Sequence, residues 1–304
     1  MKSSSFDLHA DITTRIVDAI EAGAGDFILP WHRASAIHLP RNATTGKSYR
    51  GVNILSLWIA AEARGYGAAE WATFKQWSEA GAHVRKGEKG VPIVFYKTLD
   101  VTSDEGDTQS DDGRRQIPFA RASWVFNADQ VEGHDAPLDP PRKPSAFEMI
   151  ARADNLIAAT GAAISYGGPR AFYRASEDRI QIPLAADFIG SPTATAQETF
   201  YMTVLHELAH WSGAEHRLNR VKGKRFADRD YCFEELVAEL SAAFSCARLG
   251  IATAPRPDHA QYIAQYLKLL KADKRAIFAA ATAASAATDF IMAFESDRVP
   301  SHAA

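Results

Sequence analysis

The chain has 304 residues, of which 46% are hydrophobic and 23% charged, and its formal net charge is −3. This is the composition of an ordinary globular protein, and the length favours two domains over one. No run of about 18 apolar residues is evident, so the sequence predicts no membrane-spanning helix. Two cysteines, Cys232 and Cys246, are expected about 21 Å apart on one helix and unable to pair. These features predict a protein of the reducing cytoplasm.

The first 135 residues predict a mixed α/β domain. Apolar spacing and helix-ending glycines indicate helices at 6–22, 53–64 and 71–80. Strands are expected at 91–97 and 122–127. Between them, residues 100–112 hold six acids and no base, which predicts a flexible acidic loop at about 100–115.

Basic and aromatic residues alternate in this first part of the chain. From Arg33 to Lys97 there are ten Lys or Arg residues and four Glu, a local net charge of +6. Single-stranded nucleic acid is held by such side chains, because cations neutralise phosphates and flat rings stack on unpaired bases. The alternative is that the tryptophans lie in the core and that the Lys and Arg side chains are solvated. Composition alone favours this alternative. The candidate DNA-binding residues are Arg33, Arg41, Lys47, Tyr49, Arg50, Trp71, Lys75, Trp77, Arg85, Lys86 and Lys89.

Four prolines between residues 134 and 145 predict a stiff linker at 136–145. It divides the chain into an N-terminal domain, 1–135, and a C-terminal domain, 146–304. In the second domain, apolar spacing predicts helices at 197–211, 231–249 and 258–282. Residues 171–183 are expected to form two short strands around a turn.

The helix at 197–211 contains the motif His-Glu-x-x-His. His206 and His210 are four residues apart, so both imidazoles can reach one tetrahedral ion from the same face of the helix. Glu207 is then placed to take a proton from a metal-bound water. Thr195 and Glu198 predict a capping box at the start of the helix. Tyr173 and Tyr201 are candidate oxyanion donors, although packing roles are favoured for both.

Two residues compete as third ligand. His216 completes a His-Glu-x-x-His-x-x-Gly-x-x-His motif, but no methionine is suitably placed for the turn that accompanies this arrangement. Glu235 offers a carboxylate from the helix at 231–249, the gluzincin-like solution with two histidines and one glutamate. The face of that helix carrying Glu235 and Glu239 has small residues and two carboxylates that need partners if buried. We therefore favour Glu235 as ligand and Glu239 as a support for a ligand histidine.

Seven segments, in order along nearly the whole chain, resemble the ArdC-type antirestriction proteins of conjugative plasmids, which are related to the N-terminal part of TraC-type primases. They are Pro30-Trp-His, Thr45-Gly-Lys-Ser-Tyr-Arg-Gly-Val-Asn, Val84-Arg-Lys-Gly-Glu-Lys-Gly, Val125-Phe-Asn-Ala-Asp-Gln-Val, Ala171-Phe-Tyr-Arg, His206-Glu-Leu-Ala-His-Trp-Ser-Gly and Glu234-Glu-Leu-Val-Ala-Glu-Leu. The resemblance implies an α+β protein: a mixed α/β domain that binds single-stranded DNA, then a mainly helical, zincin-like metallopeptidase domain with a small sheet. It also implies the ligands His206, His210 and Glu235, with Glu207 as general base.

The resemblance predicts a cytoplasmic protein that protects incoming plasmid DNA from host restriction during conjugation. Zinc is the expected metal, with Mn²⁺ or Co²⁺ as other divalent ions that suit the ligands. Single-stranded DNA is the expected partner, a host protein is a further candidate substrate, and no membrane role is expected. Two alternatives stay open at this point. One is a metallopeptidase with no DNA role, and the other is a DNA-coating protein whose metal site is only structural.

Overall fold

The computed structural model describes residues 7–24, 29–32, 38–102, 114–134, 145–191, 193–220, 229–253 and 259–296. For 96–102, 114–120, 259–261 and 296 it describes the backbone only. The predicted linker at 136–145 and most of the predicted acidic loop lie outside these residues.

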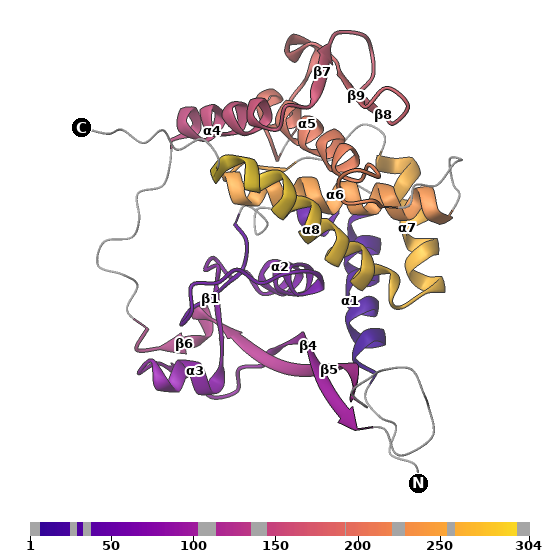
Figure 1. Cartoon of the computed structure of the whole chain (residues 1–304). Coiled ribbons are helices and arrows are strands. Elements are labelled where there is room, and N and C mark those ends of the chain that lie inside the picture. Colours follow the sequence, from indigo (N-terminus) through magenta and orange to yellow (C-terminus); the bar gives the residue numbers. More distant parts are fainter. Residues whose placement is uncertain are drawn as a thin grey trace, which may run out of the picture.

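A four-stranded sheet forms the base of the N-terminal half (Figure 1). Its strands, in spatial order, are β1 (Arg41–Asn42), β2 (Glu70–Thr73), β5 (Arg114–Asn127) and β4 (Val91–Thr102). The two long strands, which contain the predicted strands 91–97 and 122–127, pair antiparallel and are both longer than expected. Around the sheet lie α1 (Leu8–Gly23), η2 (Pro30–His32), α2 (Val52–Arg64), α3 (Phe74–Glu79), η4 (Ala128–Gln130) and the pair β3 (His83–Val84) and β6 (Val131–Glu132).

The predicted helix at 71–80 is wrong in its first turn. Trp71 to Thr73 belong to β2, where they pair with β5, and the helix begins only at Phe74. Thr73 stops the strand and starts the helix, because its hydroxyl accepts a hydrogen bond from the Gln76 N–H at 3.2 Å.

In its described residues, the C-terminal half combines a small sheet with five α-helices. The helices are α4 (Ala146–Ala159), α5 (Ala196–Ser212), α6 (Arg229–Leu249), α7 (His259–Ala272) and α8 (Ala276–Ser296). The sheet has the order β7 (Ala163–Tyr166), β9 (Arg179–Ile182), β8 (Phe172–Arg174), and η5 (Ala185–Asp187) follows it. The single helix predicted at 258–282 is wrong: a turn divides it, in which Asp273 accepts hydrogen bonds from the Arg275 and Ala276 N–H groups.

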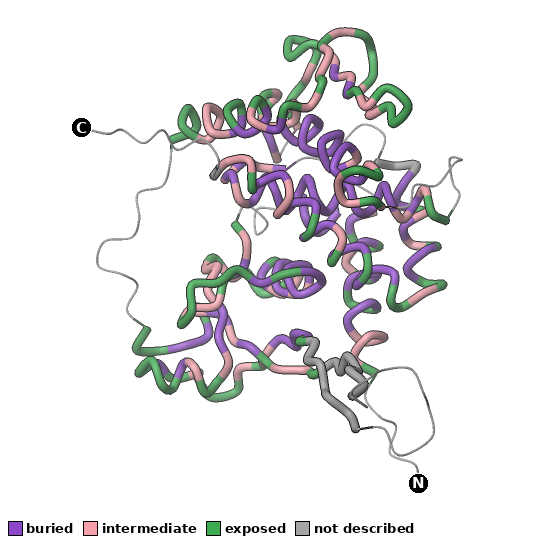
Figure 2. The backbone as a smooth tube through the Cα atoms, in the orientation of Figure 1, coloured by how far each residue is buried: buried purple, intermediate pink, exposed green. Residues whose placement is uncertain are grey.

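The two halves share one hydrophobic core. Its buried side chains come from α1 and α2 of the first half and from α6, α7 and α8 of the second. Figure 2 shows the buried residues concentrated in these central helices, between the two sheets. The predicted division at 136–145 therefore does not separate two independent cores.

Helix α8 has an apolar segment, Ala276–Glu295, long and apolar enough to cross a membrane by length and composition, with a mean hydropathy of 1.6. This segment was not expected from the sequence. Its residues Ile277 and Ala284 lie in the shared core, and Ile291 lies in the core beneath α5. The apolar character of α8 thus matches its place between α5, α6 and α2.

Candidate metal centre

Helix α5 places two imidazoles side by side in the interior. The predicted capping box at its start is confirmed: Thr195 accepts from the Glu198 N–H, and the Glu198 carboxylate accepts from the Thr195 N–H at 2.8 Å. The helix is buried along most of its length, so the four-residue spacing of His206 and His210 holds their rings in one protected place. Their Nε2 atoms are 3.2 Å apart.

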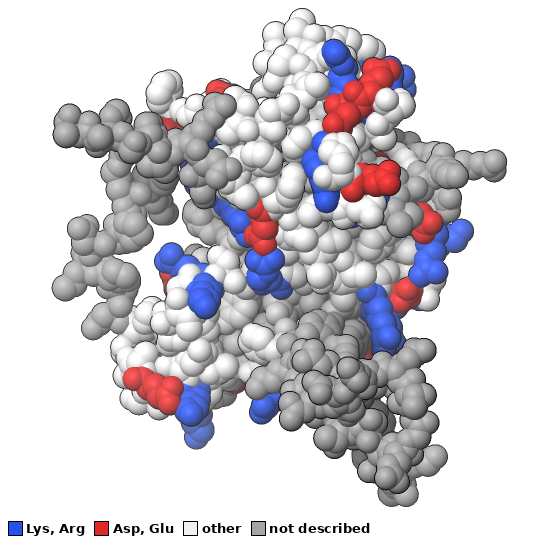
Figure 3. Space-filling view, viewed as in Figure 1, with Lys and Arg blue, Asp and Glu red and all other residues white. Residues whose placement is uncertain are grey.

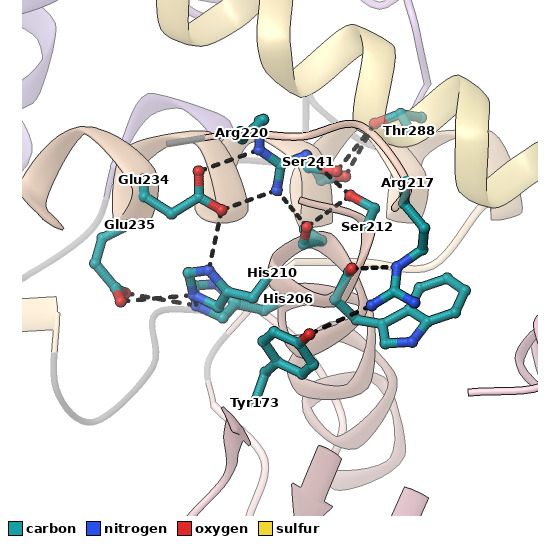
Figure 4. Close-up of polar contacts among 12 residues, drawn as sticks. Tyr173, His206, His210, Ser212, Arg217, Arg220, Glu234, Glu235, Ser241 and Thr288 are labelled. Atoms are coloured by element: carbon teal, nitrogen blue, oxygen red, sulfur yellow. Dashed lines mark hydrogen bonds and ion pairs between the residues drawn. The ribbon is translucent and has the colours of Figure 1, made fainter. Parts of the chain in front are cut away.

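Helix α6 packs against α5 and brings a carboxylate to the same point. The Glu235 oxygens lie 3.6 Å from Nε2 of His206 and 3.5 Å from Nε2 of His210. Among the described residues, these three side chains form a group whose candidate ligand atoms all lie within 4.8 Å of one another. Figure 4 shows Glu235 pointing at the two rings from the neighbouring helix.

The spacing of these atoms fits a divalent ion. A tetrahedral ion with bonds of about 2.0–2.2 Å to nitrogen and oxygen sets its ligand atoms roughly 3.3–3.6 Å apart. The two Nε2 atoms are 3.2 Å apart, and each lies 3.5 or 3.6 Å from one of the two Glu235 oxygens, close to that range. Two nitrogens and one carboxylate are also the donor set of catalytic zinc sites that keep a fourth position open.

A second carboxylate of α6 supports His210. Glu234 Oε1 lies 3.4 Å from Nδ1 of His210 and 2.8 Å from Nη2 of Arg220 (Figure 4). Burial alone would raise the pKa of Glu234, but hydrogen bonds from His210 and Arg220 outweigh it and hold that pKa below its usual value. Gly213 makes this possible, because a Cβ there would lie only 2.7 Å from Nη2 of Arg220. Sequence reasoning missed the role of Glu234, although its place beside Glu235 could have suggested it.

The third carboxylate of α6, Glu239, lies behind His206. Its Oε2 is 3.6 Å from Nδ1 of His206, and its role as a support of this ligand stays a prediction. Its Oε1 lies 2.7 Å from Nε2 of His32 and accepts from Nε1 of Trp31 at 3.2 Å. All four side chains are buried. Residues 31 and 32 thus connect the N-terminal half directly to the surroundings of the candidate ligands.

His216 lies apart from this group. Its side chain is 66% exposed, and its Nε2 lies 3.5 Å from Asp178. Asp178 also binds Arg217 and accepts from the Tyr173 hydroxyl at 2.7 Å. The Arg217 hydrogen bond is the largest influence on Asp178 and lowers its pKa to about 2. Tyr173 therefore serves this surface network.

A cleft of about 930 Å³ opens beside the candidate ligands. Glu207, Tyr231 and Tyr262 line it, together with residues 168–171. The hydroxyls of Tyr231 and Tyr262 are 3.2 Å apart. Burial, the hydrogen bond with Tyr262 and the nearby Glu235 charge raise the pKa of Tyr231 well above its usual value, so this residue stays a proton donor. Tyr201, the other predicted oxyanion donor, instead donates to Asp154 at 2.8 Å.

The predicted DNA-binding aromatics lie in the core. Trp71 and Trp77 are 1% and 0% exposed, and the Tyr49 hydroxyl donates to the Trp71 carbonyl at 3.2 Å. No base can stack on rings packed in this way, so the structure corrects the interpretation of these three residues. These rings belong to the core, which is the alternative that composition favoured.

Four of the predicted DNA-binding cations form ion pairs. Arg41 binds Glu70, Arg50 binds Asp289, Lys75 lies 3.5 Å from Glu79, and Arg85 lies 2.9 Å from Glu88. Figure 3 accordingly shows basic and acidic side chains mixed on the face in view. Within the described part of the chain, Lys47, Lys86 and Lys89 are exposed without an ion pair. Arg33 lies outside the described residues.

Other aromatic side chains of the N-terminal half are exposed instead. Phe74 is 61% exposed, Trp124 51% and Phe95 46%. The sequence placed Phe74 among the aromatics interleaved with basic residues, but Phe95 and Trp124 were missed, because alternation along a strand does not say which face is covered. The one signal of exposure in the sequence was that Phe74 is followed directly by Lys75 at the start of a helix.

Two family models match the chain. Residues 6–126 match the N-terminal domain of anti-restriction factor ArdC, and residues 151–283 match a zincin-like metallopeptidase. A Sinorhizobium fredii protein, y4eC, is 45% identical over 296 residues, which cover 96% of this chain and 93% of that protein. An Escherichia coli DNA primase TraC is 35% identical over 305 residues, which cover 96% of this chain and 27% of the primase.

Solved structures are also similar. The metal-free antirestriction protein ArdC from the R388 plasmid superposes with a TM-score of 0.78 at 36% identity, covering 96% of this chain and 99% of that one. The Mn(II)-bound structure of ArdC from the same plasmid gives a TM-score of 0.77 at 34% identity.

Proposed function

Because the chain belongs to the ArdC family of antirestriction proteins, we propose that it binds single-stranded DNA, protects incoming plasmid DNA from host restriction, and carries a working zinc-dependent peptidase site. The observation that carries the peptidase part is the convergence of His206, His210 and Glu235 beside the cleft that contains Glu207. The match to the ArdC N-terminal domain supports the DNA part.

In this proposal, His206, His210 and Glu235 hold the ion. When bound, zinc lowers the pKa of a water molecule and polarises a peptide carbonyl. The chain's own groups do the remaining work. Glu207, buried at the cleft, accepts the proton of the attacking water and later returns it to the leaving amine. Tyr231 donates a hydrogen bond to the oxygen that gains charge.

Glu234 and Glu239 keep the ligand imidazoles oriented. Each carboxylate lies beside the Nδ1 atom of one histidine, which leaves both Nε2 atoms directed at the ion. Arg220 holds Glu234, while His32 and Trp31 hold Glu239. The site is thus preorganised by groups that do not touch the substrate.

A plasmid-transfer assay tests the proposal. It compares the wild type with Glu207→Ala, which keeps the three ligands, and with the matched control Glu215→Ala, an exposed acid just past α5. We expect Glu207→Ala to lose protection of the incoming plasmid while still binding metal, and Glu215→Ala to protect as the wild type does. Full protection by Glu207→Ala would refute a role for peptide cleavage. Absence of single-stranded DNA binding by the wild type at low salt would refute the DNA role.

A further inference from the structure

The outer face of the N-terminal sheet, the one turned away from α2, carries a row of aromatic side chains. Residues two apart on a strand point to the same side, so Trp124 and Phe126 share a face of β5. Val125 between them points the other way, where it packs with Leu57 and Ala61 of α2. Figure 1 shows α2 on one side of this sheet and α3 on the other.

Phe74, Phe126 and Trp124 form a continuous row that we call the outer aromatic face. The rings of Phe74 and Phe126 have centroids 6.3 Å apart. The Phe126 ring and the Trp124 Cβ flank Gly90, where an added Cβ would lie 3.1 Å from each. Gly90 therefore leaves the space that these two side chains occupy, and a larger residue would displace them.

This row is accessible to a ligand. Phe74 and Trp124 are 61% and 51% exposed, and Phe126 is half-buried against the cluster that contains Trp77. Scattered single exposed apolar residues are normal on protein surfaces. Three aromatic rings in a contiguous row are different, because such rows mark interaction surfaces.

Cations border the row. Lys75 follows Phe74 and has a side chain that is 83% exposed. Lys86 and Lys89 lie in the loop that leads to Gly90, and both are exposed. The backbone of this loop is fixed, because the Lys89 carbonyl accepts hydrogen bonds from Arg64 at 2.7 Å and from Gln130 at 3.2 Å.

We infer that the outer aromatic face is where unpaired nucleotides stack, with Lys75, Lys86 and Lys89 contacting their phosphates. The inference rests on the proposed function for the class of ligand and adds the place of contact. Exposed rings beside exposed lysines match the two parts of a nucleotide, a flat base and an anionic phosphate. Duplex DNA is excluded as the preferred ligand, because its bases are stacked on one another and offer no free face to a side chain. The contact is tolerant of sequence, since every base has such a face.

Fluorescence anisotropy with a labelled oligo-dT tests this placement. We expect the double variant Phe74→Ala/Trp124→Ala to bind at least about tenfold more weakly than the wild type, given the usual contribution of a stacked base. The conservative variant Phe74→Tyr/Trp124→Phe should bind within about threefold of the wild type, because it keeps both ring faces. Phe147→Ala is the matched control, because Phe147 is 82% exposed but lies on α4, and it should bind as the wild type does.

A salt titration tests the lysines separately. Replacing Lys86 and Lys89 with Ala should make the plot of log affinity against log salt shallower, by about 0.7 for each lysine removed. Intact binding by the double aromatic variant, with a wild-type melting curve, overturns the inference while the DNA role survives. No binding by the wild type at low salt overturns the proposed DNA function itself. The two failures are therefore distinguishable.

Discussion

The side chains of the candidate metal centre and those of the outer aromatic face differ in burial and in the contacts that support them. At the centre, a buried carboxylate lies beside each histidine, and further side chains contact these carboxylates in turn. On the outer face, Phe74 and Trp124 are exposed on a sheet whose own core lies beneath them. Substitutions at the centre should therefore cost stability as well as ligand affinity. Substitutions on the outer face should cost ligand affinity alone.

The largest expected effect separates core aromatics from surface aromatics. Trp77→Ala should lower the free energy of unfolding by about 3–5 kcal/mol, because it removes a fully buried ring and its hydrogen bond to the Phe126 carbonyl. Phe74→Ala, three residues away, should change it by about 0.5 kcal/mol or less. Urea unfolding measures both. Similar losses for the two variants would contradict the division between core and outer face.

The next effect tests the connection between η2 and the metal centre. His32→Ala should lower the free energy of unfolding by about 2–4 kcal/mol, because it leaves the buried Glu239 carboxylate without its nearest hydrogen-bond partner. His216→Ala serves as the control, since its exposed ring should contribute about 0.5 kcal/mol or less. A stable His32→Ala variant with unchanged metal affinity would show that this connection has no role.

Glu234→Gln isolates the support of His210. The variant keeps the shape of the side chain but removes the charge that faces His210 and Arg220. We expect metal affinity to fall about 10–100-fold with the fold intact, as is usual for groups that orient a ligand histidine. Isothermal titration with Zn²⁺ provides the measurement. Wild-type affinity would mean that the carboxylate does not orient the ring.

The smallest effect concerns pH and the surface network around Asp178. Its folded pKa of about 2 lies below the ordinary 3.8, so its contribution to stability is complete above about pH 4 and is lost as the pH falls toward 2. The Asp178→Asn variant should thus differ slightly from the wild type at pH 6 and converge with it near pH 2. Because the carboxylate is 40% exposed, solvent weakens the pairing. Melting curves of both proteins across this pH range provide the measurement. A difference in stability that does not change with pH would contradict the role of the Asp178 charge.

Local patterns in the sequence predicted part of this molecule well. The α+β class, the resemblance to the ArdC family and the helices that carry His206, His210 and Glu235 follow from helical spacing, caps and motifs, which act over a few residues. The comparisons confirm the class and the family. The grouping of Glu235 with the two histidines could be proposed because its helix face carries small residues and two carboxylates that need partners if buried.

What depends on long-range packing was missed. In the sequence, Trp71 and Trp77 look the same as exposed stacking residues. Only their packing distinguishes them: Trp71 is buried with residues of α2, and Trp77 of α3 is buried with Ala72 of the sheet. His32 approaches Glu239 across more than 200 positions of sequence, which no local pattern predicts. The shared core of α1, α2 and α6–α8 likewise follows from tertiary packing and not from the proline-rich segment.

Metal titration of three proteins tests the central claim most directly. We predict that the wild type binds one divalent ion per chain, that His216→Gln binds it equally well, and that Glu235→Gln binds it at least about a hundredfold more weakly because a ligand charge is lost. Melting curves with and without metal give a second readout, since the ion should stabilise the wild type and His216→Gln more than Glu235→Gln. Unchanged affinity in Glu235→Gln, or a loss confined to His216→Gln, would contradict the ligand set of His206, His210 and Glu235.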